Sequence, residues 1–215
     1  WRGGSCLDLC DMLVYIYRAL GIPCGIEELP MRGNNNAPHF WNFLVDQHGQ
    51  TWYFSMFYWW HRLLKAEVYA DVYGKVFRQR FSLNRDMMDS LRMPLDSVHP
   101  VFRYPFFEDV TRLYATDKAF TLSVGKQHLA RDIRAGEVVY ICMSDRYAWK
   151  PVGWTRYDGS NAVFKDCHGG TIYCLAVYDA ANDKLAPVSS PFSVGQENGK
   201  MEFYDVQEET EDVVL

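Results

Sequence analysis

A cysteine and a histidine near the start of the chain have the types and spacing of a nucleophile and its base. Cys6 follows Ser5, a residue type that favours the N-cap of a helix, so Cys6 is expected at the first helical position. The unpaired N–H groups and the dipole at that position stabilise a thiolate, which is the nucleophilic form of the side chain. His39 opens a predicted strand after a polar loop and would accept the proton. Such a pair attacks an acyl carbon to form a thioester, which water or an amine then resolves.

Two observations weigh against an immediate assignment of this pair. A core cysteine and an ordinary strand histidine would show the same spacing. Asp8 also places a negative charge close to Cys6, and that charge opposes a thiolate. The histidine would therefore have to supply much of the activation.

The helix that carries Cys6 is predicted over residues 5–20. Its apolar residues recur at helical spacing and form one apolar stripe, made of Leu9, Leu13, Ile16 and Leu20. Ser5 and Asp8 form a capping-box-like start. Gly21 is expected to take the left-handed conformation that ends a helix, and Pro23 prevents the helix from continuing.

Strands predominate after this helix. They are predicted over residues 39–45 and 51–57, joined by a hairpin turn at 46–50, and again over 75–81. Residues 83–105 lose periodicity and contain several prolines, so they are predicted to form a connector that lies over a surface.

From about residue 106 the pattern changes to short strands at regular spacing, with turn signals such as Asn198-Gly199 between them. The predicted strands are 120–124, 137–143, 150–154, 162–164, 171–178, 191–194 and 201–206. Short strands without a helical pattern favour an antiparallel β-sandwich. The sequence therefore predicts an α+β unit over residues 1–82, a connector over 83–105 and an all-β sandwich over 106–215.

Three segments, in this order, resemble the core of the transglutaminase-like superfamily, whose fold is papain-like. They are Gly4-Ser5-Cys6-Leu7-Asp8, Tyr17-Arg18-Ala19-Leu20-Gly21-Ile22-Pro23 and His39-Phe40-Trp41-Asn42. The resemblance covers residues 3–57 and implies a helix packed on an antiparallel sheet. It also implies a cysteine acyl-transfer enzyme that acts on amide bonds as a peptidase, amidase or transglutaminase, without cofactor or metal. Cys6 would be the nucleophile and His39 the base, and backbone N–H groups near Cys6 would hold the oxyanion.

One residue of the family pattern is missing. In the family an aspartate a few residues after a tryptophan orients the histidine, but Trp52 is followed by Tyr53-Phe54-Ser55-Met56. Three interpretations are open: Ser55 holds the imidazole through its hydroxyl, an acid such as Asp71 or Glu67 replaces the carboxylate, or the site is degenerate. Loss of a triad carboxylate costs about four orders of magnitude in rate in serine proteases. A degenerate site would belong to a non-catalytic cell-surface protein that binds peptide or glycan.

The candidates for a substrate groove have two interpretations each. Trp41 is either a wall of the groove or a core aromatic, and Asn36, in a run of asparagines, either lines the cleft or serves a turn. The aromatic cluster at residues 59–61 either stacks on a ligand or covers an open edge of the unit. Asp46, at the hairpin tip, is expected to favour the turn.

Composition narrows the class of partner. The net charge is −5, and lysines and arginines are scattered rather than clustered, which argues against nucleic acid. No stretch has the length of a membrane span, and the abrupt start at Trp1 without a signal peptide is expected of the C-terminal part of a longer protein. The six cysteines include no CxxC motif, and no HxxxH pair completes a zinc site.

The second half carries a looser resemblance. Phe107-Glu108-Asp109-Val110-Thr111 with Tyr114, followed by the strand series, resembles β-sandwich modules attached to transglutaminase-like domains in surface proteins of Bacteroidetes. That resemblance implies an extracytoplasmic protein with a peptide, protein or glycopeptide substrate. Trp149 and Trp154 flank a predicted strand and are interpreted either as a platform for glycan or as core aromatics.

Overall fold

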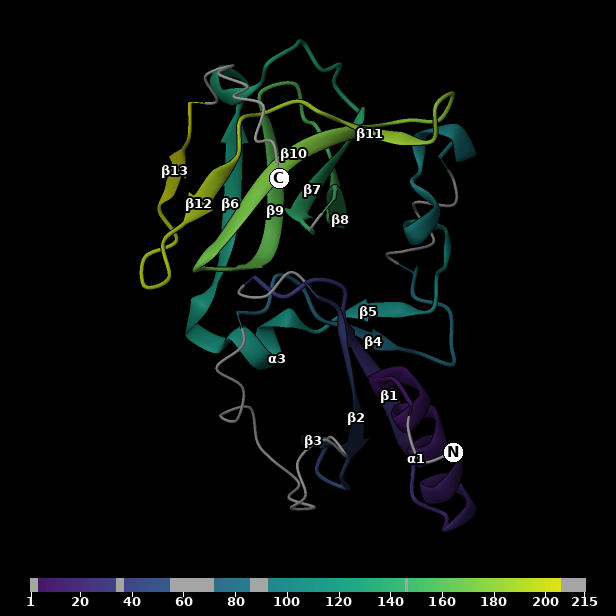
Figure 1. Cartoon of the computed structure of the whole chain (residues 1–215). Helices are drawn as coiled ribbons and strands as arrows, with labels where there is room; N and C mark the ends of the chain where they lie inside the picture. Colours follow the sequence, from purple (N-terminus) through teal and green to yellow (C-terminus); the bar gives the residue numbers. More distant parts are fainter. Residues whose placement is uncertain (1–3, 34–36, 55–71, 86–92, 146, 206–215) are drawn as a thin grey trace, which may run out of the picture.

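The chain forms two units, built mainly from antiparallel strands, that lie one above the other in Figure 1. The computed structural model describes residues 4–33, 37–54, 72–85, 93–145 and 147–205. The first unit combines helix α1 (Cys6–Ala19) with a five-stranded sheet, and the second contains two facing sheets. The architecture is α+β and rich in strands, in agreement with the predicted class.

The sheet of the first unit has the order β3-β2-β1-β4-β5, and every pair of neighbours is antiparallel. Its strands are β1 (Cys24–Leu29), β2 (His39–Val45), β3 (Thr51–Phe54), β4 (Phe77–Gln79) and β5 (Phe107–Asp109). β2 begins and ends at the predicted residues, whereas residues 55–57 of the second predicted strand lie outside the described part of the chain. β5 pairs with β4, so the first sheet extends beyond the predicted boundary at residue 105.

Local hydrogen bonds define both ends of α1. The Ser5 hydroxyl accepts from the Asp8 backbone N–H, and the Asp8 carboxylate accepts from the Ser5 backbone N–H, so the predicted capping box is present. At the other end Gly21 has φ +77°, and the N–H groups of Gly21 and Ile22 donate to the carbonyls of Arg18 and Tyr17. This is a Schellman arrangement, as the glycine predicted.

The buried face of α1 differs from the predicted stripe. Cys10 is 4% exposed and is the buried residue of the helix, whereas Ile16 is 46% and Leu20 70% exposed. The Asn42 side chain of β2 donates to the Cys10 carbonyl at 3.0 Å, which places Cys10 over the middle of the β1–β2 pair. In the described part of the chain α1 packs against this one sheet, so a narrow face is buried and Ile16 and Leu20 of the apolar stripe are exposed.

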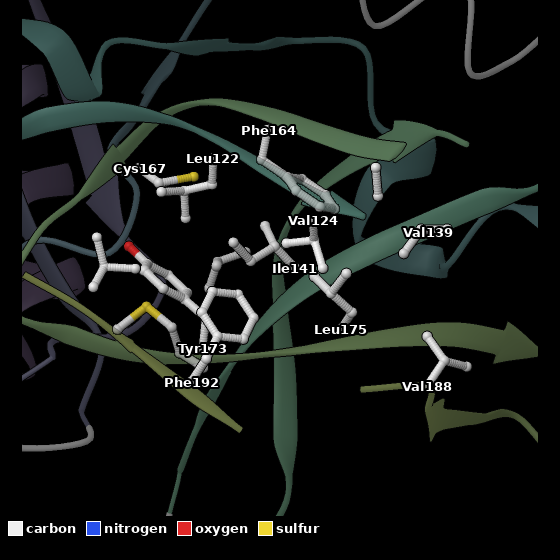
Figure 2. Close-up of a cluster of buried hydrophobic side chains, with 14 of the residues drawn as sticks. Leu122, Val124, Val139, Ile141, Phe164, Cys167, Tyr173, Leu175, Val188 and Phe192 are labelled. Atoms are coloured by element: carbon white, nitrogen blue, oxygen red, sulfur yellow. The ribbon is translucent and has the colours of Figure 1, made fainter. Parts of the chain in front are cut away.

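The second unit is a sandwich. One sheet has the order β13-β12-β10-β7-β8, with β11 also paired to β10, and the other contains β6 and β9. The strands are β6 (Ala119–Gly125), β7 (Val138–Ser144), β8 (Trp149–Arg156), β9 (Asn161–His168), β10 (Thr171–Asp179), β11 (Lys184–Pro187), β12 (Phe192–Val194) and β13 (Met201–Phe203). Each predicted strand after residue 106 therefore has a counterpart, while β5 of the first sheet and β11 of the sandwich were not predicted. Figure 2 shows side chains of the two sheets pointing toward one another, among them Leu122 and Phe164 from one side and Tyr173 and Leu175 from the other.

The segment between the units packs more deeply than a surface connector. Short 3-10 turns η1 (Leu95–Ser97) and η2 (Pro100–Arg103) run along one side of the sandwich (Figure 1). Phe102 is buried and its ring stacks on that of Tyr140 at 5.8 Å between centroids. After β5, helix α3 (Thr111–Ala115) inserts Tyr114 into the core of the first unit. The units are therefore joined by shared packing.

Candidate active site at the start of helix α1 and strand β2

The direction of α1 decides which end of the sheet Cys6 approaches. Near the C-terminus of the helix, the Arg18 guanidinium donates to the carbonyl of Cys24, the first residue of β1, at 2.9 and 3.0 Å. In the middle of the helix, the Cys10 carbonyl meets Asn42. Cys6 lies one helical turn beyond Cys10, about 6 Å along the axis. The N-terminus of α1 therefore points toward the end of the sheet at which β1 finishes and β2 begins.

His39 is the first residue of β2 and lies at that same end. It pairs in register with Leu29 and stands three residues, about 10 Å, beyond Asn42. Side chains alternate along a strand, so His39 and Trp41 share the face opposite to Asn42 and α1. The structure brings Cys6 and His39 to one end of the sheet, from two sides. For the Cys6 thiolate and the His39 imidazole to touch, the two side chains have to meet around the first residue of β2.

The thiol of Cys6 differs from the five other thiols of the chain. Cys6 is partly exposed, while the remaining cysteines are buried, and all six are free. Burial raises the pKa of Cys10 to about 12, of Cys24 to about 11 and of Cys167 to about 12, and it also raises the pKa of Cys142 and Cys174. A neutral thiol is a poor nucleophile, so these five side chains are chemically quiet at neutral pH.

As its position in the sequence predicts, Asp8 places a negative charge that opposes a thiolate at Cys6. Its carboxylate accepts from the backbone N–H of Ser5 at 2.7 Å and from the Ser5 hydroxyl at 2.8 Å. These hydrogen bonds lower the pKa of Asp8, so the group is ionised at neutral pH. A negative charge therefore stays in the first turn of the helix, beside Cys6.

A buried polar cluster holds the ring that supports His39. The His39 and Trp41 rings lie 5.8 Å apart, and His39 is 8% exposed. The Trp41 indole N–H donates to Glu27 and to Tyr114, each at 2.9 Å. Glu27 is fully buried and accepts two hydrogen bonds from the Arg78 guanidinium, at 2.8 and 2.6 Å, and one from the Tyr114 hydroxyl. Sequence reasoning missed this cluster.

The signal for Glu27 was present in the sequence. The run Cys24-Gly25-Ile26-Glu27-Glu28-Leu29 between Pro23 and Pro30 is apolar apart from two acids. A carboxylate inside an apolar run is buried only when it is paired. Burial raises the pKa of Glu27, while the charge and hydrogen bonds of Arg78 lower it.

Trp41 is a core residue in this fold. It is 2% exposed and packs with Tyr53, Tyr73 and Tyr114. So little accessible surface cannot wall a substrate groove, and the interpretation as a core aromatic is the one that its burial favours. At this end of the sheet its ring lies next to that of His39.

Several other candidates lie outside the described residues. These are Ser55, Asp71, Glu67, Asn36 with its neighbouring asparagines, and the aromatic cluster at 59–61. Asp46 is described and takes the turn role expected of it: it accepts from the backbone N–H groups of His48 and Gln50 and from the Trp52 indole. Those bonds lower the pKa of Asp46 and occupy both of its oxygens.

In the described part of the chain, no three His, Cys, Asp or Glu side chains come together as ligands for a metal ion. Within those same residues no helix has both the length and the apolar character needed to cross a membrane. Comparison with known proteins found no family model, no curated protein and no solved structure that matches the chain.

Proposed function

We propose that the chain is a transglutaminase-like cysteine acyl-transfer enzyme that acts on amide bonds, with Cys6 as nucleophile and His39 as base. One observation carries the proposal. Of six thiols, Cys6 alone is not buried, and it begins a capped helix whose N-terminus points to the end of the sheet where His39 stands. A helix N-terminus and a neighbouring imidazole are the two features that activate a thiol, and the position of Cys6 at the start of α1 supports the proposal through the first of them.

The proposed reaction has two halves. The Cys6 sulfur attacks the amide carbonyl as its proton passes to the His39 imidazole, and backbone N–H groups at the start of α1 stabilise the oxyanion. Collapse of the tetrahedral intermediate breaks the C–N bond, and the departing amine takes the proton from the imidazolium. Water or a second amine then attacks the thioester, the imidazole again accepts and returns one proton, and the thiol is restored.

Trp41 and Glu27 act in this scheme as positioning residues. Glu27 fixes the indole, and the indole restricts the ring of His39 from one side. An indole cannot accept a proton or neutralise an imidazolium. We therefore expect a slower enzyme than one with a carboxylate against the histidine. On the basis of the family resemblance, the proposal also includes an extracytoplasmic location for the protein and a peptide, protein or glycopeptide as its substrate.

A second candidate function is a non-catalytic binding protein that keeps the fold. The placement of His39 on the face of β2 opposite to α1 favours it, because a direct contact with Cys6 needs the two side chains to meet around the strand start. The two functions differ in one measurable property, which is the reactivity of the Cys6 thiol at neutral pH.

The test is site-resolved alkylation of the native protein with iodoacetamide between pH 5 and pH 9, read by mass spectrometry. An ordinary thiol with a pKa of about 8.5 is roughly 3% ionised at pH 7, so full ionisation of Cys6 raises its rate up to about thirtyfold. His39→Ala should remove that advantage. His48→Ala, which changes an exposed histidine in the hairpin turn, should leave it intact. An ordinary rate in the wild type, unaffected by His39→Ala, would refute the enzyme and favour the binding protein.

A further inference from the structure

A groove of about 800 Å³ lies where the end of the β1–β2 pair meets the sandwich. The first unit contributes Glu28, Pro30 and Pro38 to its lining, and the start of β8 contributes Trp149 and Pro151. Pro38 directly precedes His39 in the chain, so one end of the groove lies next to the start of β2. Glu28 shares with Asn42 the face of the sheet on which α1 packs, because Ile26 pairs with Asn42 in register. The groove therefore lies on the Cys6 side of the sheet.

A narrow recess adjoins this groove. Its volume is about 30 Å³, and it shares Glu28, Pro30, Val101 and Pro151 with the groove lining. The remaining lining residues are Phe77, Phe102 and Phe107. The recess thus consists of three phenylalanine rings, an aliphatic wall and one carboxylate. Its volume exceeds the roughly 10–15 Å³ that a cavity needs to hold one water molecule, so the recess accommodates a small polar group.

Among the described residues, the carboxylate in this recess has no partner. Glu28 is partly buried, and its side chain forms no hydrogen bond or ion pair with any of them. Burial raises its pKa. Its neighbour Glu27 points to the other face and is saturated with donors. An unpaired acid between aromatic rings is costly to keep unless something binds it.

We propose that the recess binds the primary ammonium group of a peptide that lies in the groove, with a lysine side chain as the matching group. An ammonium head has the size of the recess, is attracted to aromatic rings and pairs with a carboxylate. The aliphatic stem of lysine would run past Val101 and Pro151, and the peptide would continue toward Trp149, which packs against the buried cluster that contains Phe102 and Tyr140. The recess anchors the ligand and does not take part in bond cleavage. That the anchored peptide is the substrate of Cys6 rests on the proposed function; its binding does not.

The experiment uses a Cys6→Ala variant, so that no turnover occurs, and measures binding by isothermal titration calorimetry. The ligand is the blocked tripeptide Ala-Lys-Ala, and the matched ligand has norleucine in place of lysine. We expect the lysine peptide to bind about tenfold or more tightly than the norleucine peptide, because one charge-assisted contact differs. Adding Glu28→Gln should reduce lysine binding to the level of norleucine. Adding Glu202→Gln, which removes an exposed carboxylate of β13 at the far side of the sandwich, should not.

Three results would overturn the inference: no binding of the lysine peptide, equal binding of both peptides, or unchanged lysine binding after Glu28→Gln. The proposed function is tested separately, by the alkylation rate of Cys6 in the Glu28→Gln protein with its cysteine intact. If the lysine peptide binds through Glu28 while Cys6 reacts as an ordinary thiol, the recess is a binding site and the enzyme proposal fails. If Cys6 is activated but Glu28→Gln changes no affinity, the enzyme stands and the lysine recess fails.

Discussion

Removal of the Glu27 carboxylate is the sharpest test of how the first unit is held together. The side chain is fully buried and joins three strands and a helix: β1 carries it, β4 supplies Arg78, β2 supplies Trp41 and α3 supplies Tyr114. Arg78 is itself 15% exposed, and its guanidinium also donates to Thr51 and lies 4.1 Å over the Phe43 ring. The partners of Glu27 are therefore fixed in place and cannot easily turn to water.

The expected loss of unfolding free energy depends on which buried groups each substitution leaves without a partner. Glu27→Ala leaves a largely buried guanidinium without its counter-charge and the Tyr114 hydroxyl without its acceptor, while the Trp41 indole N–H keeps Tyr114 as its one acceptor. Breaking a buried pair in this way costs about 3–5 kcal/mol of unfolding free energy. Glu27→Gln keeps the shape and one acceptor oxygen but loses the charge, and we expect a loss of roughly 1–3 kcal/mol. The essential expectation is that the wild type is the most stable, Glu27→Gln is less stable and Glu27→Ala is the least stable.

The assay is urea unfolding followed by far-UV circular dichroism, with the midpoint and slope fitted for each variant. Glu108→Ala serves as the matched control, because Glu108 lies on β5 of the same sheet, is 44% exposed and pairs with Arg80 only at 3.7 Å. A surface pair of this kind contributes at most about 1 kcal/mol. If Glu27→Ala lies within about 1 kcal/mol of the wild type, or is no worse than the control, the reasoning about this cluster is wrong.

Three further outcomes are expected. Glu28→Gln should raise the free energy of unfolding at pH 7, because burial raises the pKa of Glu28 above its value in the unfolded chain and folding therefore penalises the ionised form. The penalty is present at neutral pH and disappears below about pH 4, where the carboxyl is protonated in both states. Urea unfolding of both proteins at pH 7 and below pH 4 measures the difference. Gly21→Ala should cost about 1–2 kcal/mol in urea unfolding, because no neighbour lies within 4 Å of an added Cβ and the loss comes from φ +77° alone; an unchanged midpoint would contradict the C-cap. In native protein at pH 8, iodoacetamide should alkylate the thiol of Cys6 within minutes and the other five thiols only after unfolding. Early alkylation of Cys10 or Cys24 would contradict their burial.

Local sequence patterns predicted those features whose hydrogen bonds are local. The capping box, the glycine C-cap of α1, the bounds of β2 and the turn at Asn198-Gly199 each depend on residues within a few positions of one another. The strands of the sandwich followed from alternation and turn residues in the same way. Cys6 and His39 could likewise be singled out, because a helix start and a strand start are both visible in the sequence.

Contacts between distant residues were beyond such patterns. β1 was missed because its two acids break the apolar run, and each acid has a distinct role only in the fold: Glu27 meets Arg78 and Tyr114 from far along the chain, while Glu28 turns to the recess. The assignment of β5 to the first sheet, the exposure of Ile16 and the burial of Trp41 likewise depend on which surfaces meet. Periodicity tells which side of an element is apolar, but burial depends on the partner that covers it, and that partner is chosen by packing of the whole chain.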